Sequence, residues 1–523
     1  MAALSRIAER LLARPLLLAP VLGAVAALGF EPLHLWPLTL LSVAWLTVAT
    51  ATAQSRFRAF LTGWLWAVGH FCTGSFWIAT SFTYQAEMPA SLGFLGVFLL
   101  SLYLAVYPGL AALAAWHARR RPLALVLAFA AAWIVSEWLR SWVFTGFAWN
   151  PLGIALLGPF DGQGLAPLAK VIGTYGLSGV LVLVSGLLLG IGRNRRGLMA
   201  GLALLVVLAP MLLTGLIPPP QGKMRYTLIQ PNIAQQDIAN PDAYEDQFQR
   251  LAKLSLPRTR GDERLVLWPE SGVPDYLREG YPAYFYQEST YAGDPAMARR
   301  RIGGVIGPGS LLLTGAVDLD MQGDAIIGAR NVVTAIAPDG ALRGSYAKAH
   351  LVPYGEYLPM RGLLEPLGLS RLVAGSLDFL PGPGPRTLDF GPYGKAGFQV
   401  CYEIVFSGQV ADRANRPDYI FNPSNDGWFG ARGPPQHLAQ ARLRAIEEGL
   451  PVLRSTTNGI SAVIDADGIV RQHLPRFVAG RLDGKVPPAH APTLFARFGN
   501  MLPLLLAAIL LGLSALVLSR ARR

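Results

Sequence analysis

The sequence contains few charged residues and almost no cysteine. Asp, Glu, Lys and Arg together make 15% of its 523 residues, whereas hydrophobic residues make 52%. A globular domain in water normally carries about 25% charged residues. This composition therefore excludes a purely soluble protein and predicts segments that cross a bilayer.

Two common kinds of cofactor site are also missing. The glycine-rich segment 303–307 is not followed by the Lys-Ser or Lys-Thr pair of a P-loop. The seven histidines are scattered, and Cys401 has no second thiol nearby, so no group has metal-ligand spacing. We therefore predict neither a metal nor any other cofactor.

Eight apolar segments are long enough to span a membrane. They occupy roughly residues 15–30, 34–53, 59–82, 89–116, 122–140, 170–192, 197–217 and 499–519. This pattern predicts a transmembrane domain of seven spans over residues 1–217, a polar domain over 218–498, and a final span with a basic tail over 499–523. Small residues at 24–27 resemble a signal-peptide cleavage site, but the alternation of basic loops favours an uncleaved first helix.

Arginines gather in alternate loops of this arrangement. Fourteen of them lie at positions 6–14, 56–58, 119–121, 193–196 and 520–523. The positive-inside rule makes these segments cytoplasmic, so both termini are cytoplasmic and the polar domain lies outside the cytoplasm. The same segments explain the net charge of +12, and we therefore exclude a nucleic-acid partner.

The two cysteines are far apart in this topology. Cys72 lies in the third apolar segment and Cys401 lies in the polar domain. A disulfide between them is not expected, so both are predicted to be free thiols. Because a lone thiol is unusual in an oxidising compartment, we interpret Cys401 as either catalytic or buried and inert.

Residues 224–498 alternate between short β-like segments and polar helical ones. Strands are expected at 226–229, 265–268, 311–314, 332–336, 396–400 and 419–421, and helices at about 241–255 and 436–449. Buried strands that alternate with helices predict a layered α/β domain with a central sheet.

Three reactive side chains follow strands of this domain: Glu270, Lys348 and Cys401. Ligands gather beyond the carboxyl ends of strands in open α/β sheets, so these side chains can converge. A carboxylate can take the proton of a thiol that attacks an acyl carbon, and an ammonium can stabilise the resulting oxyanion. Taken singly, each residue is more often a buried or capping residue, so the surrounding sequence decides.

Four segments around these residues resemble the nitrilase superfamily. They are Trp-Pro-Glu-Ser at 268–271, the segment 348–357, Cys-Tyr-Glu at 401–403, and Asn-Pro-Ser-Asn-Asp-Gly-Trp-Phe at 422–429. Together with the seven-plus-one arrangement of apolar segments, they make the chain similar to the apolipoprotein N-acyltransferase family over nearly its full length. The resemblance implies an eight-span helical bundle that carries an α-β-β-α sandwich.

The resemblance also implies roles for individual residues. Glu270 would be the general base, Lys348 the oxyanion stabiliser and Cys401 the nucleophile, while Glu356 would hold or tune Lys348. Three further residues match positions that the family keeps beside its site: Tyr402, Glu403 and Trp428.

Two later segments, 436–448 and 454–459, resemble the family's late helix and the strand after it. We interpret most of their residues as scaffold. Thr457 stands where the family often has asparagine, but this position belongs to no predicted catalytic group.

The implied activity is lipoprotein maturation in the bacterial inner membrane, with the catalytic domain in the periplasm. An acyl chain would pass from a phospholipid, typically phosphatidylethanolamine, to Cys401 as a thioester. It would then pass to the α-amine of a diacylglyceryl-cysteine on an apolipoprotein. A single reactive thiol suits such a two-step exchange, and membrane lipids are expected partners.

Two segments rich in aromatic residues and leucine are expected to contact the bilayer and control lipid entry. The first is 276–286, for which ordinary domain core is an equal alternative. The second is 357–364 with Leu367, Leu369 and Leu372.

Two other functions are compatible with these residues. A membrane-tethered amidase or nitrilase would use the same triad to hydrolyse small amides, and a small closed pocket would favour it. A transporter or sensor would only bind its ligand, and it would tolerate Cys401→Ser.

Overall fold

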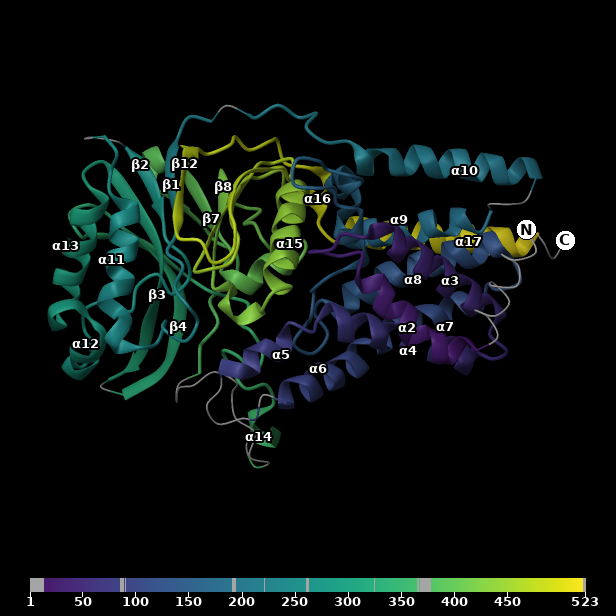
Figure 1. The fold of residues 1–523 in the computed structure, drawn as a ribbon, viewed down its shortest axis with the longest axis horizontal. Coiled ribbons are helices and arrows are strands. Elements are labelled where there is room, and N and C mark those ends of the chain that lie inside the picture. Colours follow the sequence, from purple (N-terminus) through teal and green to yellow (C-terminus); the bar gives the residue numbers. More distant parts are fainter. Residues whose placement is uncertain are drawn as a thin grey trace.

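The computed structural model describes residues 14–84, 89, 91–190, 194–220, 222–259, 263–323, 325–364, 366 and 378–520. Two parts follow one another along its longest axis: a bundle of helices, and a body in which helices flank two β-sheets (Figure 1). The candidate catalytic residues all lie in the body.

The bundle contains the apolar segments that the sequence predicted. Its helices are α2 (Pro15–Ala27), α3 (Trp36–Thr52), α4 (Arg56–Gly74), α6 (Ser91–Leu104), α7 (Val106–Trp116), α8 (Pro122–Arg140), α9 (Ala169–Leu188), α10 (Asn194–Leu208) and α17 (Met501–Arg520). In the described part of the chain, four helical segments are long and apolar enough to cross a membrane. They are Ser91–Trp116, Pro122–Arg140, Ala166–Leu188 and Met501–Arg520.

Three further apolar helices are shorter than a full span. Pro15–Ala27, Trp36–Thr52 and Gly197–Leu212 each fall in the range of 10–17 residues. Proline marks two of their ends, because Pro37 is the second residue of α3 and Pro210 lies in the 3-10 helix that follows α10. The structure supports a helical membrane domain, and the number of eight spans stays a prediction.

Within the described residues, the body contains two mixed sheets of six strands each. Their strand orders are β12-β1-β2-β3-β4-β5 and β11-β10-β9-β8-β7-β6. The strands are β1 (Arg225–Gln230), β2 (Arg264–Leu267), β3 (Ser310–Gln322), β4 (Ala325–Ile336), β5 (Leu342–Ala347), β6 (Thr387–Asp389), β7 (Lys395–Phe398), β8 (Tyr419–Ser424), β9 (Val452–Thr456), β10 (Ser461–Ile464), β11 (Val470–Leu474) and β12 (Gly480–Lys485). The strands β1, β2 and β3 run parallel, as do β7, β8 and β9.

Helices cover the outer faces of both sheets. Helices α11 (Tyr244–Ser255), α12 (Ala283–Ser289) and α13 (Pro295–Ile306) lie outside the first sheet (Figure 1). Helix α15 (Gly433–Glu448) lies outside the second sheet, on the side that faces the bundle (Figure 1). Apolar side chains of the two sheets, such as Leu267 and Phe421, pack between them. This arrangement is the α-β-β-α sandwich that the resemblance implied.

Helix α15 connects the body to the bundle through buried polar contacts. The Arg442 guanidinium donates at 2.7–2.8 Å to four carbonyl oxygens, one in the body and three in a loop of the bundle: Gly468, Gly158, Pro159 and Gly162. Glu447 Oε1 accepts the backbone N–H and the hydroxyl of Thr174 in α9 at 2.6 and 2.7 Å. Buried charges are tolerated where their hydrogen-bonding groups find partners, as they do here.

The predicted strands and helices of the body are all present. Each of the six predicted segments overlaps a strand, from β1 at 226–229 to β8 at 419–421. The predicted helices at 241–255 and 436–449 correspond to α11, with the 3-10 turn before it, and to α15. The alternation of short apolar and polar segments therefore predicted a layered α/β architecture correctly, but the single central sheet that it suggested is wrong, because the strands form two sheets.

The two segments that were expected to contact the bilayer differ in their position and in the exposure of their side chains. Residues 276–286 lead into α12, which lies on the side of the first sheet away from the bundle (Figure 1), and Leu277 is fully buried there. This position does not support bilayer contact for the segment, in which Leu277 and Tyr286 are core residues and Tyr284 is exposed. In the segment 357–364, Met360 and Leu363 are exposed, as a lipid-contacting segment requires. Leu367, Leu369 and Leu372 lie outside the described residues.

Candidate active site

Cys401 lies where strand β7 turns into the short 3-10 helix η9 (Cys401–Val405). Its φ of +50° is in the left-handed region, which residues other than glycine rarely adopt and which is frequent at functional sites. The strand before Cys401 was expected at 396–400, whereas β7 ends at Phe398, so two residues lie between the strand and Cys401. Cys401 is only 5% exposed and is therefore buried.

Lys348, Glu270 and Glu356 meet beside this turn. Lys348 Nζ lies 2.9 Å from Glu356 Oε1 and 3.6 Å from Glu270 Oε1. Lys348 directly follows β5, and Glu270 comes three residues after β2. Segments that are far apart in the sequence thus place one ammonium between two carboxylates.

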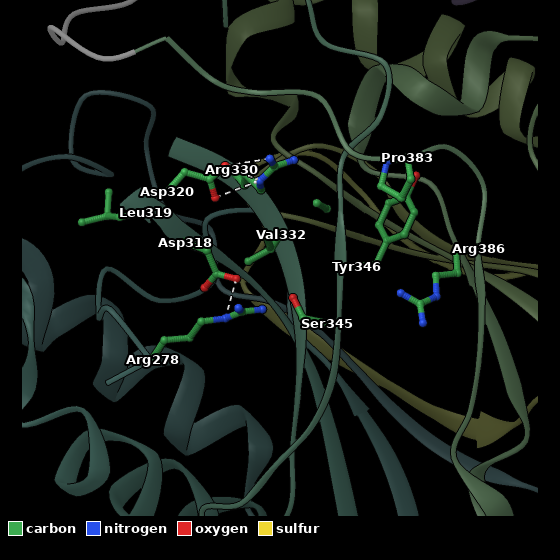
Figure 2. A pocket seen from close by; sticks show the side chains of 11 residues that line it. Arg278, Asp318, Leu319, Asp320, Arg330, Val332, Ser345, Tyr346, Pro383 and Arg386 are labelled. Carbon is green, nitrogen blue, oxygen red and sulfur yellow. Dashed lines mark hydrogen bonds and ion pairs between the residues drawn. The ribbon is translucent and has the colours of Figure 1, made fainter. Parts of the chain in front are cut away.

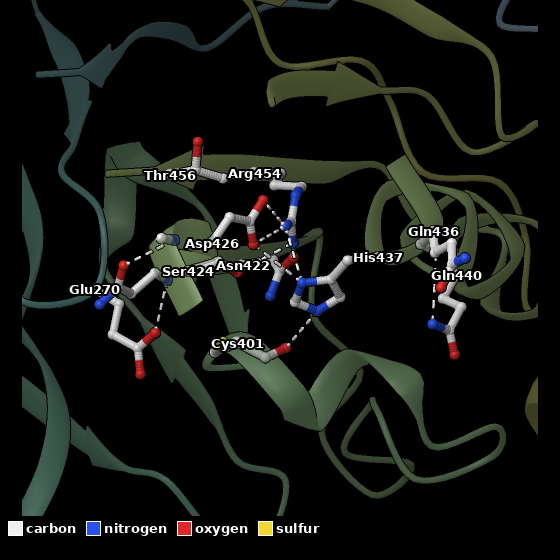
Figure 3. A network of polar contacts seen from close by, with 12 residues as sticks. Glu270, Cys401, Asn422, Ser424, Asp426, Gln436, His437, Gln440, Arg454 and Thr456 are labelled. Atoms are coloured by element: carbon white, nitrogen blue, oxygen red, sulfur yellow. Dashed lines mark hydrogen bonds and ion pairs between the residues drawn. The ribbon is translucent and has the colours of Figure 1, made fainter. Parts of the chain in front are cut away.

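The thiol lies within reach of the same charges. Glu270 Oε2 accepts the backbone N–H of Asn425 at 2.7 Å, and this N–H also stabilises the charged form of Cys401. Figure 3 shows Glu270 and Cys401 in the same network of polar contacts. The sulfur, a carboxylate and an ammonium therefore share one buried site.

The electrostatics of the site make the resting thiol neutral. Burial raises the pKa of the Cys401 thiol well above its ordinary value; Glu270 raises it further, and Lys348 opposes this rise. For Lys348, burial lowers the pKa, but attraction to Glu356 and Glu270 outweighs burial, and the pKa is raised. A neutral thiol beside a charged ammonium needs a base that takes its proton during attack.

Hydrogen bonds of Glu403 connect the turn that carries Cys401, here called the nucleophile turn, to the segment that carries Lys348. Its Oε2 accepts the Val400 N–H at 2.7 Å. Its Oε1 accepts the N–H groups of Ala349 and His350 at 2.7 and 3.1 Å and the Tyr346 hydroxyl at 2.9 Å. All four partners are donors, so this carboxylate fixes the position of Cys401 relative to Lys348.

Both parts of the chain match known families. Residues 22–187 match the Apolipoprotein N-acyltransferase N-terminal domain, and residues 227–490 match the Carbon-nitrogen hydrolase family. The chain is 34% identical to the apolipoprotein N-acyltransferase of Rhodopseudomonas palustris, over 96% of this chain and 94% of that protein. It is 35% identical to the enzyme of the same name from Azotobacter vinelandii, over 97% of this chain and 96% of that protein. The chain belongs to the apolipoprotein N-acyltransferase family.

The body alone is also similar to a solved structure. An amidase of the nitrilase superfamily from Nesterenkonia shares 19% identity with it at a TM-score of 0.35, covering 52% of this chain and 94% of that chain. The curated relatives that span nearly the whole chain bear the name apolipoprotein N-acyltransferase, and membership of that family does not favour the amidase alternative.

Two further positions that the apolipoprotein N-acyltransferase resemblance singled out flank the site. Tyr402 is buried, and its ring packs edge-on against Phe406 with centroids 5.1 Å apart. Trp428 is half-buried and lies at the boundary with the bundle. Its carbonyl oxygen accepts the Ser81 hydroxyl at 3.0 Å, and its ring contacts Tyr84 at 5.7 Å. Trp428 therefore lies on the side of the site that faces the membrane helices.

Asn331 contacts two residues of the candidate active site, but the sequence did not predict this role. Its Nδ2 donates to Glu270 Oε1 at 2.7 Å and to Glu356 Oε1 at 3.0 Å. It lies within strand β4, where an amide among apolar residues was the only available signal. Asn425 lay inside the segment 422–429 but was given no role.

A separate pocket of about 190 Å³ lies over strands β3, β4 and β5 (Figure 2). Two ion pairs line it: Arg278 Nε lies 2.8 Å from Asp318 Oδ2, and Arg330 Nη2 lies 2.6 Å from Asp320 Oδ2. Glu270, Lys348 and Cys401 do not line this pocket. It is therefore distinct from the site around the thiol.

Proposed function

We propose that this chain transfers an acyl chain from a phospholipid, through a thioester on Cys401, to the N-terminal amine of a diacylated apolipoprotein. Phosphatidylethanolamine is the proposed donor, and a diacylglyceryl-cysteine is the proposed acceptor. The observation that supports this best is the contact of Lys348 with Glu270 and Glu356 beside a buried thiol. It occurs in a chain that belongs to the apolipoprotein N-acyltransferase family over nearly its full length.

In the first half-reaction the Cys401 sulfur attacks the ester carbonyl carbon of the phospholipid, and Glu270 takes the thiol proton. The ammonium of Lys348 stabilises the oxyanion that forms on the carbonyl oxygen. The ester C–O bond then breaks, and the leaving lysophospholipid alkoxide takes the proton from Glu270. The acyl chain remains on the sulfur as a thioester.

In the second half-reaction the amine of the apolipoprotein attacks the thioester carbonyl, and Glu270 takes a proton from the attacking nitrogen. Lys348 again stabilises the oxyanion. The C–S bond breaks, and the departing sulfur recovers the proton from Glu270. The products are an amide on the lipoprotein and the resting thiol.

The remaining site residues are proposed to support these steps. Glu356 keeps Lys348 charged and in place, since its Oε1 lies 2.9 Å from Nζ. Glu403 fixes the nucleophile turn through Val400. Tyr402 and Trp428 shape the side of the site that faces the bundle, where both lipid substrates would enter.

We also propose the finer topology that the basic loops indicate: eight spans in a bacterial inner membrane, a periplasmic body, and cytoplasmic termini. The domain limits are those predicted above, 1–217, 218–498 and 499–523. The end of α17 lies at the far end of the bundle from the body, which is consistent with this (Figure 1). Alkaline phosphatase fused after residue 220 is expected to be active, and the same enzyme fused after residue 520 is expected to be inactive.

The experiment that tests the function uses the purified full chain in detergent with radiolabelled phosphatidylethanolamine. We expect a labelled adduct that hydroxylamine releases and that Cys401→Ala abolishes. The matched control Cys72→Ala keeps the adduct. A diacylated lipopeptide is expected to remove the label from the protein. Absence of any adduct in folded wild-type protein would overturn the proposal.

A further inference from the structure

His437 in α15 contacts the backbone of the nucleophile. Its ring is fully buried, and Nε2 lies 3.0 Å from the Cys401 carbonyl oxygen (Figure 3). A carbonyl oxygen only accepts hydrogen bonds, so this contact requires a proton on Nε2.

The other ring nitrogen faces a cation. Arg454 Nη2 lies 3.0 Å from His437 Nδ1, and a guanidinium can only donate. Asp426 Oδ1 lies farther away, 3.2 Å from the same nitrogen, and both oxygens of Asp426 accept from Arg454 at 2.7 and 2.8 Å. Nδ1 therefore accepts from Arg454, and burial and Arg454 lower the pKa of His437 to about 4, so the ring is the neutral tautomer with its proton on Nε2.

Aromatic rings fix the orientation of the imidazole. The ring centroids of Trp149 and Phe429 lie 5.3 and 5.5 Å from that of His437. Trp149 comes from the loop that follows α8 of the bundle, and its Nε1 donates to Gln436 in α15 at 2.8 Å. The imidazole is thus held from both parts of the protein.

The hydrogen bond acts on a strained segment. Cys401 has a φ of +50°, a conformation that persists only where the surroundings hold it. His437 holds the carbonyl at the start of η9, and Arg444 Nη1 donates at 3.1 Å to the Val405 carbonyl at its end. Both donors come from α15, so one helix fixes the turn that aims the sulfur.

We propose that His437 is a positioning residue for the acyl transfer: its Nε2–H holds the Cys401 carbonyl so that the thiol points at the acyl carbon, and Arg454 and Asp426 fix the tautomer that makes this possible. The proposal deepens the function proposed above and rests on it. It assigns a role to a residue in a segment that was interpreted as scaffold from the sequence.

The first test reads the tautomer directly and does not depend on activity. The full chain is labelled with ¹⁵N-histidine in detergent, and the His437→Gln variant identifies the His437 resonances. We expect a neutral imidazole with the proton on Nε2 at pH 7. A proton on Nδ1 alone, or a doubly protonated ring, would overturn the proposal.

The second test separates positioning from packing. Gln can present an amide N–H near the position of Nε2, whereas Leu fills similar space without a donor. We expect His437→Leu to slow single-turnover thioester formation by about 10–100-fold with little change in the KM for phospholipid, because small misplacements of a nucleophile have effects of this size. His437→Gln should recover most of the rate. The control His473→Leu, at an exposed position of β11, should behave like wild type.

Two outcomes have separate meanings. If Leu and Gln slow thioester formation equally and lower the melting temperature equally, His437 only packs, and the proposal is overturned. If wild-type protein forms no thioester at all, the proposed function fails, while the tautomer experiment still decides whether His437 holds the carbonyl.

Discussion

The side-chain amide of Asn331 donates a hydrogen bond to Glu270 Oε1 at 2.7 Å. The same nitrogen donates to Glu356 Oε1 at 3.0 Å, so one amide holds both carboxylates that contact Lys348. The proposed base therefore has its position fixed from the middle of strand β4, by a residue that itself takes no proton.

Replacing Asn331 is expected to slow the chemistry. Asn331→Leu removes the donor, and Glu270 loses its fixed position relative to the thiol, which should slow thioester formation by about 10–100-fold. Asn331→Asp should be worse, because it adds a third carboxylate beside a single ammonium. Single-turnover assays with labelled phospholipid measure both. The exposed Asn415→Leu is the control, and an Asn331→Asp variant as fast as wild type would contradict this role.

Alkylation of Cys401 is expected to depend steeply on pH. Because burial raises the pKa of the thiol, the thiolate fraction should increase about tenfold per pH unit without a plateau up to pH 9. Lys348 lowers this pKa, so Lys348→Met combined with Glu356→Gln should slow alkylation at every pH in this range. A small neutral thiol reagent on the Cys72→Ala background reports the rate. A plateau below pH 7 would show a preformed thiolate and contradict the prediction.

The buried pair Arg454 and Asp426 should matter for stability. Attraction to Arg454 outweighs burial and keeps the pKa of Asp426 below its usual value. Arg454→Met leaves a buried carboxylate without its partner, and we expect a loss of about 3–5 kcal/mol. Asp426→Asn added to Arg454→Met should recover part of that loss. Melting in detergent, followed by tryptophan fluorescence, compares the variants. Equal stability of Arg454→Met and wild type would argue against the pair.

Stability should also depend on pH through His437. Burial and then Arg454 lower the pKa of His437 to about 4, whereas the ordinary value is 6.5. Between these values the unfolded chain binds a proton that the folded protein does not, so stability falls as the pH falls through this window. The expected loss between pH 7 and pH 5 is roughly 2 kcal/mol.

His437→Gln tests this dependence, because its amide takes up no proton. Asp426 and Arg454, the charged groups that face the ring, remain in the variant. The melting temperature of wild type relative to the variant should therefore decrease from pH 7 to pH 5. His473→Gln serves as the control and should follow wild type. A difference that does not change with pH would contradict the prediction.

The sequence predicted several strands whose side chains are buried on both faces, although β10, which is entirely buried, was not among them. Strand β2 and strand β8 are entirely buried, and their short apolar segments stood out. Strands β11 and β12 were not predicted, because they are sheet edges: β12 buries only Leu482, and β11 buries no residue. Edge strands face solvent, so their composition is close to that of a loop.

The sequence predicted only those site residues that come directly or shortly after a strand. Glu270 and Lys348 were singled out by that rule, and the structure places them together. Asn331 lies within a strand and His437 within a helix, so no local pattern marks them. The state of the thiol also required coordinates, since burial and the distances to charges decide it and spacing in the sequence contains neither.

The contacts of Arg442 have a practical consequence for anyone who hopes to work with the catalytic half as a water-soluble module. Three of the four carbonyl oxygens that receive its guanidinium belong to the loop of residues 158–162. A fragment that begins after the membrane helices would lack these carbonyl oxygens. The Arg442 guanidinium would lose three hydrogen-bond acceptors, and the neighbouring face of α15 would be exposed to water. Such a fragment is expected to aggregate, so inhibitor screening and crystallisation require the intact membrane protein.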